Sequence, residues 1–143
     1  MTFPPASNLE RILTVVIFFI CAGLIAVGWF LTPDSRGFGT HSQLGFGECG
    51  LAATYGMPCP TCGMTTAFAY GVRFKIIDGF QTQPAGLLTA LLAYAAELLL
   101  IVFFSARKNP FAFFTKKRVY IIAVIVLLIA AASWVYKIQT FRQ

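Results

Sequence analysis

Three of the four cysteines lie within 14 residues, at Cys49, Cys59 and Cys62, and the only histidine, His41, precedes them. Residues three apart are neighbours on a helix, so the thiols of Cys59 and Cys62 can share a metal ion or form a disulfide. Pro60 suits the first position of a helix, which places Cys59 at the N-cap. A helix N-terminus favours negative charge, as a thiolate carries. We therefore expect a helix that starts at Pro60.

Three chemistries fit this cysteine set. A structural disulfide would join Cys49 to Cys59 or Cys62, in an oxidising compartment. A metal site would use the three cysteines and His41, a structural zinc set of the Cys3His type. Thiol–disulfide exchange would use Cys59 as the attacking thiol, Cys62 as the resolving thiol and Cys49 as a relay. No thioredoxin-like βαβ pattern surrounds the motif, and all three interpretations stay open at this point.

The elements that must position these residues are apolar helices. Residues 12–31, 85–104 and 119–136 contain no Asp, Lys or Arg, and each stretch is long enough to cross a bilayer as a helix. The chain is 58% apolar and 11% charged, whereas soluble domains are about half apolar and about a quarter charged. We predict an all-α integral membrane protein with three transmembrane helices in a single domain. The first stretch is longer than the apolar core of a signal peptide, so we expect it to be retained.

The charge distribution predicts the orientation. The loop of residues 105–118 carries five cations and no acid, whereas the loop of residues 32–84 is balanced. The five cations are Arg107, Lys108, Lys116, Lys117 and Arg118. Short loops rich in Lys and Arg stay cytoplasmic, which places the N-terminus inside and the cysteine loop outside. The net charge of +6 is thus attributed to topology and to contact with anionic lipid headgroups, and not to nucleic-acid binding.

The long outer loop has two parts. Residues 34–57 are rich in glycine and are expected to be irregular and turn-rich. Beyond them, apolar residues recur at helical spacing, first at Met64, Ala67, Phe68 and Gly71 and then at Phe74, Ile77 and Phe80. We predict one or two short helices that lie in the outer membrane interface.

Glu97 is the one charged residue inside the second apolar stretch. It shares a helix face with Gly86, Ala90 and Ala93, and small residues allow close approach of another helix. The carboxyl is therefore expected to face protein. A buried carboxyl in a membrane is a functional hypothesis by default: a neutral hydrogen-bonding group, a contact with another subunit, or a site for protons or ions.

The run Cys59-Pro60-Thr61-Cys62-Gly63-Met64-Thr65-Thr66 resembles a family of small bacterial membrane proteins of unknown function. The hallmark of that family is Cys-Pro-x-Cys-Gly-x-Thr-Arg, a short helix, and then Asn-Pro at the entry to a transmembrane helix. Cys49 fits an upstream cysteine of the pattern, and residues 39–45, Gly-Thr-His-Ser-Gln-Leu-Gly, are similar to a run found in some relatives. The resemblance covers residues 39–88, and it implies a location in the bacterial inner membrane.

Two positions depart from the family pattern. Thr66 replaces the arginine, and Gln83-Pro84 replaces Asn-Pro. A role of that arginine in stabilising a thiolate or binding an anion therefore does not carry over to this chain.

We expect a non-enzymatic role, as a membrane scaffold or accessory subunit that contacts lipid and either a protein partner or further copies of itself. Its outer loop would be stabilised by a disulfide or by a metal, for which zinc is the candidate. The alternative is an enzyme, a membrane thiol–disulfide oxidoreductase that uses the pair Cys59 and Cys62.

Overall fold

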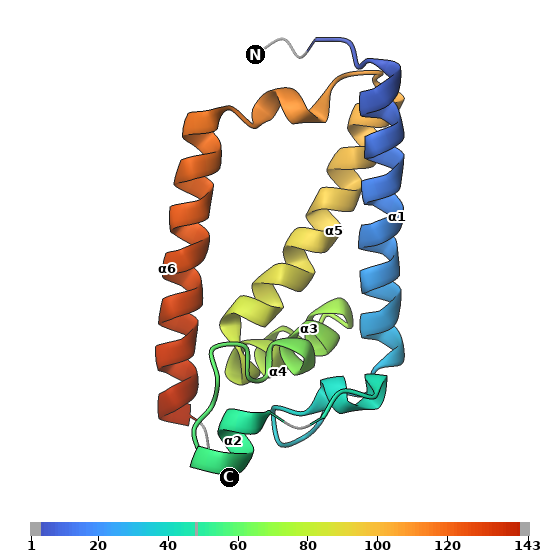
Figure 1. Ribbon diagram of the computed structural model, residues 1–143. Helices are drawn as coiled ribbons and strands as arrows, with labels where there is room; N and C mark the ends of the chain where they lie inside the picture. Colours follow the sequence, from blue (N-terminus) through green and yellow to red (C-terminus); the bar gives the residue numbers. More distant parts are fainter. Residues whose placement is uncertain (1–3, 48, 141–143) are drawn as a thin grey trace.

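A computed structural model describes residues 4–47 and 49–140, and all regular elements in these ranges are helical. Three long helices form the body of the molecule (Figure 1): α1 (Asn8–Phe30), α5 (Pro84–Ser105) and α6 (Lys116–Thr140). Each is long and apolar enough to cross a membrane, which confirms the three predicted spans and the all-α class. The short elements are η1 (Thr40–Leu44), α2 (Gly50–Tyr55), α3 (Met64–Val72), α4 (Ile76–Thr82) and η2 (Pro110–Phe113).

Helices α1 and α6 begin three or four residues before the predicted apolar stretches, and α5 begins one residue before. At the start of α1 the Ser7 side chain accepts a hydrogen bond from the Glu10 amide, and the Glu10 carboxylate accepts one from the Ser7 amide at 2.8 Å. This capping box satisfies two amides that the helix leaves without partners. Helix α5 starts at Pro84, whose missing N–H costs nothing in the first turn.

Helices α3 and α4 confirm the prediction of one or two short helices in the long loop, and they gather at one end of α1 and α5 (Figure 1). Small residues allow α3 to lie directly against α5. A Cβ added to Gly71 would come within 2.6 Å of the Ala90 Cβ, and one added to Gly86 within 2.6 Å of the Met64 carbonyl oxygen. At these distances only glycine fits. Close contact through small residues is the mode of helix packing expected in a membrane.

Arg73 closes the end of α1 next to α3. Its guanidinium donates to the carbonyl oxygens of Gly28 and Leu31, both at 2.8 Å, and to that of Trp29. Its guanidinium carbon also lies 5.4 Å from the centre of the Trp29 ring. The last carbonyls of a helix have no partner within the helix and carry partial negative charge, so a cation is favoured there.

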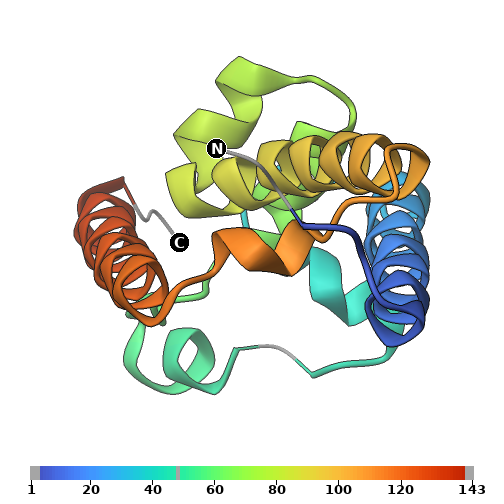
Figure 2. The same cartoon turned by 90° about the horizontal axis from the view of Figure 1, so that it is seen from above.

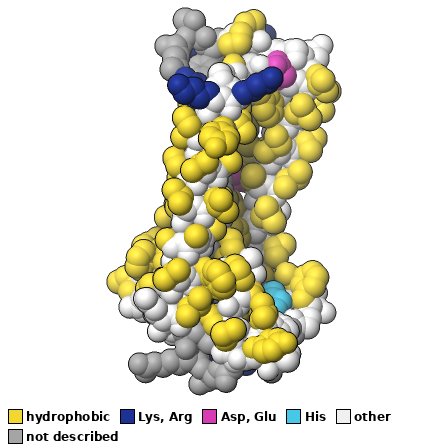
Figure 3. Space-filling view, turned by 60° about the vertical axis from the view of Figure 1, so that its left-hand side comes forward, with side chains coloured by type: hydrophobic (Ala, Val, Ile, Leu, Met, Phe, Trp, Pro, Cys, Tyr) yellow, Lys and Arg dark blue, Asp and Glu magenta, His cyan; other side chains and the backbone are white. Residues whose placement is uncertain are grey.

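The opposite end of the molecule carries the basic loop. The Ala6 amide donates to the Arg107 carbonyl oxygen and the Asn109 amide to that of Pro4, both at 3.0 Å. The start of α1 and residues 105–118 therefore lie together, away from α3 and α4 (Figure 1). The space-filling view shows hydrophobic side chains along the length of the long helices, and Lys and Arg side chains at the end that carries the basic loop (Figure 3). The side of the membrane that this end faces stays a prediction.

Helix α6 stands apart from the other two long helices over most of its length, as the end-on view shows (Figure 2). Only 6% of its most apolar window is buried within the described structure. Its two buried residues, Ser133 and Lys137, both lie near its C-terminal end. Helix α6 therefore depends on the end of the molecule that carries α3 for its attachment.

Substitution of Gly86 by alanine tests the contact between α3 and α5. We expect Gly86→Ala to lower the free energy of unfolding by about 1–3 kcal/mol, because the new methyl group meets a backbone carbonyl that cannot rotate away. Thermal unfolding in detergent, followed by circular dichroism, measures the change. Gly23→Ala is the matched control, since a Cβ there meets no atom within 4 Å. Equal stability of the two variants would contradict the packing.

Candidate functional site

The sulfur atoms of Cys49, Cys59 and Cys62 lie within 4.8 Å of one another. Cys49 directly precedes α2, and the other two cysteines precede α3. No disulfide joins any two cysteines among the described residues. The structure thus brings together the three thiols that were grouped from the sequence, although spacing along the chain predicted proximity only for Cys59 and Cys62.

The Cys-x-x-Cys motif forms a turn, and the predicted helix start at Pro60 is wrong. The Cys62 amide donates to the Cys59 carbonyl oxygen at 3.0 Å, and α3 begins only at Met64. Between them Gly63 has a φ of +86°, in the left-handed region that favours glycine. This residue interrupts the right-handed path, so Cys59 lies in the turn and is not the N-cap of α3.

Lys137 from α6 lies beside this turn. Its ammonium donates to the carbonyl oxygens of Gly37 at 3.0 Å and Thr82 at 3.1 Å, and the residue is 4% exposed. A Cβ added to Gly63 would lie 3.1 Å from the Lys137 nitrogen and 2.6 Å from the Gly37 oxygen. Gly63 therefore permits both the turn and the close approach of a buried cation to the residue that follows Cys62.

Three further side chains of α6 bind the same end of the molecule. The Trp134 indole donates to the Pro58 carbonyl oxygen at 3.1 Å, directly before Cys59. The Ser133 hydroxyl accepts from the Ala85 amide at 2.8 Å in the first turn of α5, and the Tyr136 hydroxyl donates to Gln81. The C-terminal turns of α6 therefore join the cysteine segment to the start of α5.

The sequence analysis missed the position of Lys137. A single lysine near the end of an otherwise apolar helix is also what a membrane boundary requires, so the sequence signal does not separate a solvated anchor from a buried cation. The distinction needs the contacts with Gly37 and Thr82, which lie far from Lys137 in the sequence.

Burial keeps the thiol of Cys62 protonated. Cys62 is 5% exposed, and its removal from water raises its pKa to about 11, with the neighbouring thiols of Cys59 and Cys49 adding to the shift. A buried thiolate is unfavourable unless a cation compensates its charge. Without such a cation bound at the cluster, Cys62 is a protonated thiol at neutral pH.

His41 lies in η1, where its Nε2 pairs with the Gly47 carbonyl oxygen at 3.1 Å. The compact group of ligand atoms among the described residues contains the three thiols and not this imidazole. The neighbouring Thr40 has a structural place, because its hydroxyl pairs with that of Thr66 at 2.8 Å. Thr66, which stands where relatives are expected to have arginine, is thus buried in a hydroxyl pair.

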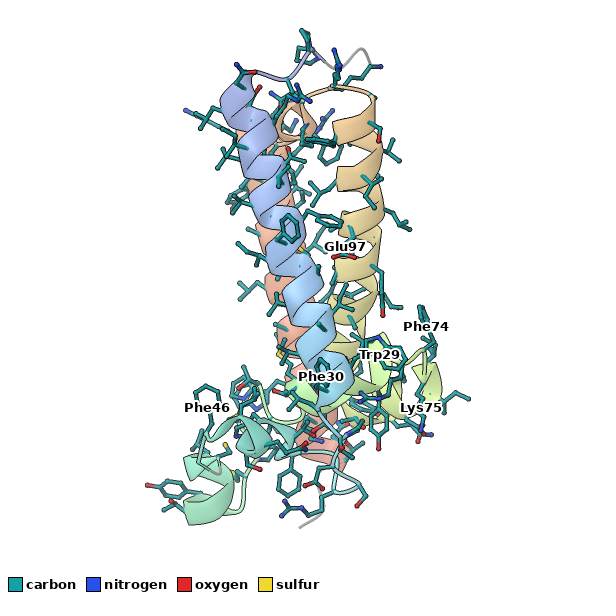
Figure 4. All side chains as sticks on the ribbon, turned by 90° about the vertical axis from the view of Figure 1, so that its right-hand side faces the viewer. Trp29, Phe30, Phe46, Phe74, Lys75 and Glu97 are labelled. Atoms are coloured by element: carbon teal, nitrogen blue, oxygen red, sulfur yellow. The ribbon has the colours of Figure 1, made fainter. Side chains whose placement is uncertain are left out.

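Glu97 lies midway along α5, farther from the thiol end of the molecule than Trp29 and Phe30, the last residues of α1 (Figure 4). Its Oε1 is buried and has no hydrogen-bond partner among the described residues. Two small residues of the predicted face, Gly86 and Ala90, are buried against α3.

The five cations of the basic loop lie at the end of the molecule away from the thiols. Arg118 stacks over the Phe113 ring at 4.7 Å and donates to the Phe113 carbonyl oxygen at 3.1 Å. The others follow the end of α5 or begin α6: Arg107, Lys108, Lys116 and Lys117. The structure thus separates the predicted lipid contacts from the cysteine site by the length of the long helices.

Three apolar helices with a cysteine cluster at one end define a small membrane protein. Residues 49–96 match a protein family described as a protein of unknown function, DUF2752. The match covers about a third of the chain and includes all three clustered cysteines. No curated protein and no solved structure matches the chain.

The raised pKa of Cys62 predicts how the metal-free, reduced protein reacts. Alkylation of Cys62 by iodoacetamide should accelerate about tenfold per pH unit from about pH 7 to about pH 10, since the thiolate is the nucleophile and its fraction rises until the pKa near 11. Peptide mass spectrometry after timed quenching measures the rate. In the unfolded chain the same rate should level off near pH 8.5, at about the ordinary thiol pKa. Levelling at that pH in the folded protein would contradict the burial.

Proposed function

We propose that this chain is a multi-pass scaffold or accessory subunit of the bacterial inner membrane whose outer end is organised by a metal ion. The observation that carries the proposal is the convergence of the Cys49, Cys59 and Cys62 sulfurs within 4.8 Å. A disulfide would use two of them and leave the third sulfur, also within 4.8 Å, unpaired. A single metal ion uses all three.

The distances and the donor set fit zinc. Tetrahedral zinc with sulfur ligands at about 2.3 Å requires sulfurs about 3.8 Å apart, so the cluster needs only a small contraction. The ligands come from the segments before α2 and α3. A bound ion would cross-link these segments, and its binding free energy would contribute to the folding of the outer end.

The surroundings suit an anionic centre. Three thiolates around one divalent ion carry a net charge of −1, and the buried ammonium of Lys137 lies next to the turn that holds Cys62. Partners outside the ligand set commonly orient ligands and adjust metal affinity. A fourth ligand completes the zinc coordination, supplied by water, by a partner, or by His41 if its imidazole leaves Gly47.

A role in presenting a surface to a partner agrees with the side chains around the cluster. Phe46, Tyr55 and Met57 flank the thiols in sequence and are 64%, 70% and 60% exposed. Apolar groups exposed together at one end of a protein mark an interaction surface. The same arrangement, with the N-terminus inside and the cysteines outside, follows from the basic loop at the opposite end.

Native mass spectrometry of the detergent-purified protein tests the metal site. We expect one zinc ion per chain, lost on treatment with a chelator and unaffected by a mild reductant. Cys49→Ser, Cys59→Ser and Cys62→Ser should each lose the ion, whereas Cys21→Ser, within α1, should retain it. A protein isolated without metal, with Cys59 and Cys62 joined in a readily reduced disulfide, would contradict the proposal and favour the thiol–disulfide oxidoreductase.

Substitution of Lys137 tests the charge beside the site. Lys137→Met should weaken zinc binding about tenfold, because the anionic centre loses its neighbouring cation. Competition with a chromophoric chelator measures the affinity. Lys117→Met is the matched control at the far end of α6, and Trp134→Phe removes a contact to Pro58 without changing charge. Both controls should bind zinc as the unaltered protein does, and an equal loss in Trp134→Phe would assign Lys137 a purely structural role.

A further inference from the structure

A groove runs between α1 and α5 in the half of the molecule away from the thiols. It encloses about 240 Å³ and is lined by apolar side chains, among them Val15 and Phe18 of α1 and Leu100, Ile101 and Phe104 of α5. The two helices are in contact nearer their other ends, where Ile25, Val72 and Ala90 form the core. Inside a bilayer such a groove fills with hydrocarbon, because apolar surface excludes water.

A cation lies at the end of this groove. Arg11 precedes Val15 by one helical turn, so both share a face of α1. The guanidinium carbon is 5.3 Å from the centre of the Phe104 ring, which lines the groove. Its Nε is buried and has no hydrogen-bond partner among the described residues.

The neighbouring carboxylate does not neutralise Arg11. Glu10 accepts hydrogen bonds from the Ser7 amide and hydroxyl and from the Asn109 side chain. The ion pair recorded between described residues joins Arg36 to Asp34, at the other end of the protein. The Arg11 guanidinium can therefore donate a hydrogen bond to a ligand at the point where the apolar groove meets the membrane surface.

We propose that this groove binds one anionic phospholipid, with the phosphate on Arg11 and an acyl chain between α1 and α5. An arginine presents N–H groups in a planar fork that matches phosphate oxygens, which makes the guanidinium the better partner for such a headgroup. The backbone pairing of Ala6 with Arg107 brings a second basic segment to the same end. Charge complementarity thus selects an anionic lipid, and the groove supplies the place for its chain.

Lipid retention in native mass spectrometry tests the site. The detergent-purified protein is exchanged into equal amounts of phosphatidylglycerol and phosphatidylcholine. We expect one bound phosphatidylglycerol that survives collisional activation, and a preference that falls about fivefold in Arg11→Gln, since one basic residue near the surface contributes about that factor. Arg11→Lys keeps the charge without the fork and should be intermediate. Lys117→Gln, which removes a cation of the same basic end at the start of α6, should lower the preference clearly less than Arg11→Gln does.

The acyl chain is tested separately. Ile101→Trp should fill the groove and reduce retention of both lipids while leaving every charge in place, and circular dichroism confirms that each variant is folded. Equal losses in Arg11→Gln and Lys117→Gln would overturn the proposal in favour of a general attraction to the basic end. Equal retention of the two lipids by the unaltered protein, or full retention by Ile101→Trp, would overturn it as well.

Discussion

The close approach of α3 to α5 is the contact on which the rest of this structure depends. It exists because Gly71 and Gly86 leave no side chain between the two helices, so that Ala90 and the Met64 carbonyl lie in the space that a Cβ would occupy. The cysteine turn directly precedes α3, and its position is therefore fixed by this contact. The same short helix packs against Gly28 of α1, whereas α6 attaches to that end of the molecule through Pro58, Thr82 and Ala85.

Backbone N–H and C=O groups in a bilayer must find hydrogen-bond partners within the protein. At the end of the molecule that carries α3, two cationic side chains meet this requirement. Arg73 supplies donors to the last carbonyls of α1, and Lys137 supplies them to Gly37 and Thr82. Each cation is half-buried or buried and so joins segments that have little apolar surface of their own. The same end can then place three thiols at one point without a large hydrophobic core.

Periodicity and composition were sufficient for the long helices and for α3 and α4, but not for η1 and α2, which lie in residues 34–57 that were expected to be irregular. The three spans and the short helix that contains Met64 and Phe68 follow from apolar spacing, and the structure differs only at their ends. The helix start at Pro60 was wrong because the fold uses Gly63 in a left-handed conformation, a choice that sequence spacing does not reveal.

The site was only partly accessible to such reasoning. Proximity of Cys59 and Cys62 follows from their spacing in the chain, whereas the approach of Cys49 depends on the path of the intervening segment through α2. The approach of Lys137 depends on how α6 docks, which involves contacts about a hundred residues apart. His41, grouped with the cysteines by composition, pairs with Gly47 because η1 directs its ring there.

The proposed metal site consists of three sulfurs of this chain around one ion. X-ray absorption at the zinc edge of the purified, metal-loaded protein reads the ligands of that ion directly. We expect three sulfur neighbours at about 2.3 Å and one lighter neighbour, nitrogen or oxygen, at about 2.0–2.2 Å. A first shell made only of nitrogen and oxygen would contradict it, since the metal would then be bound elsewhere and the cysteine cluster would have another purpose.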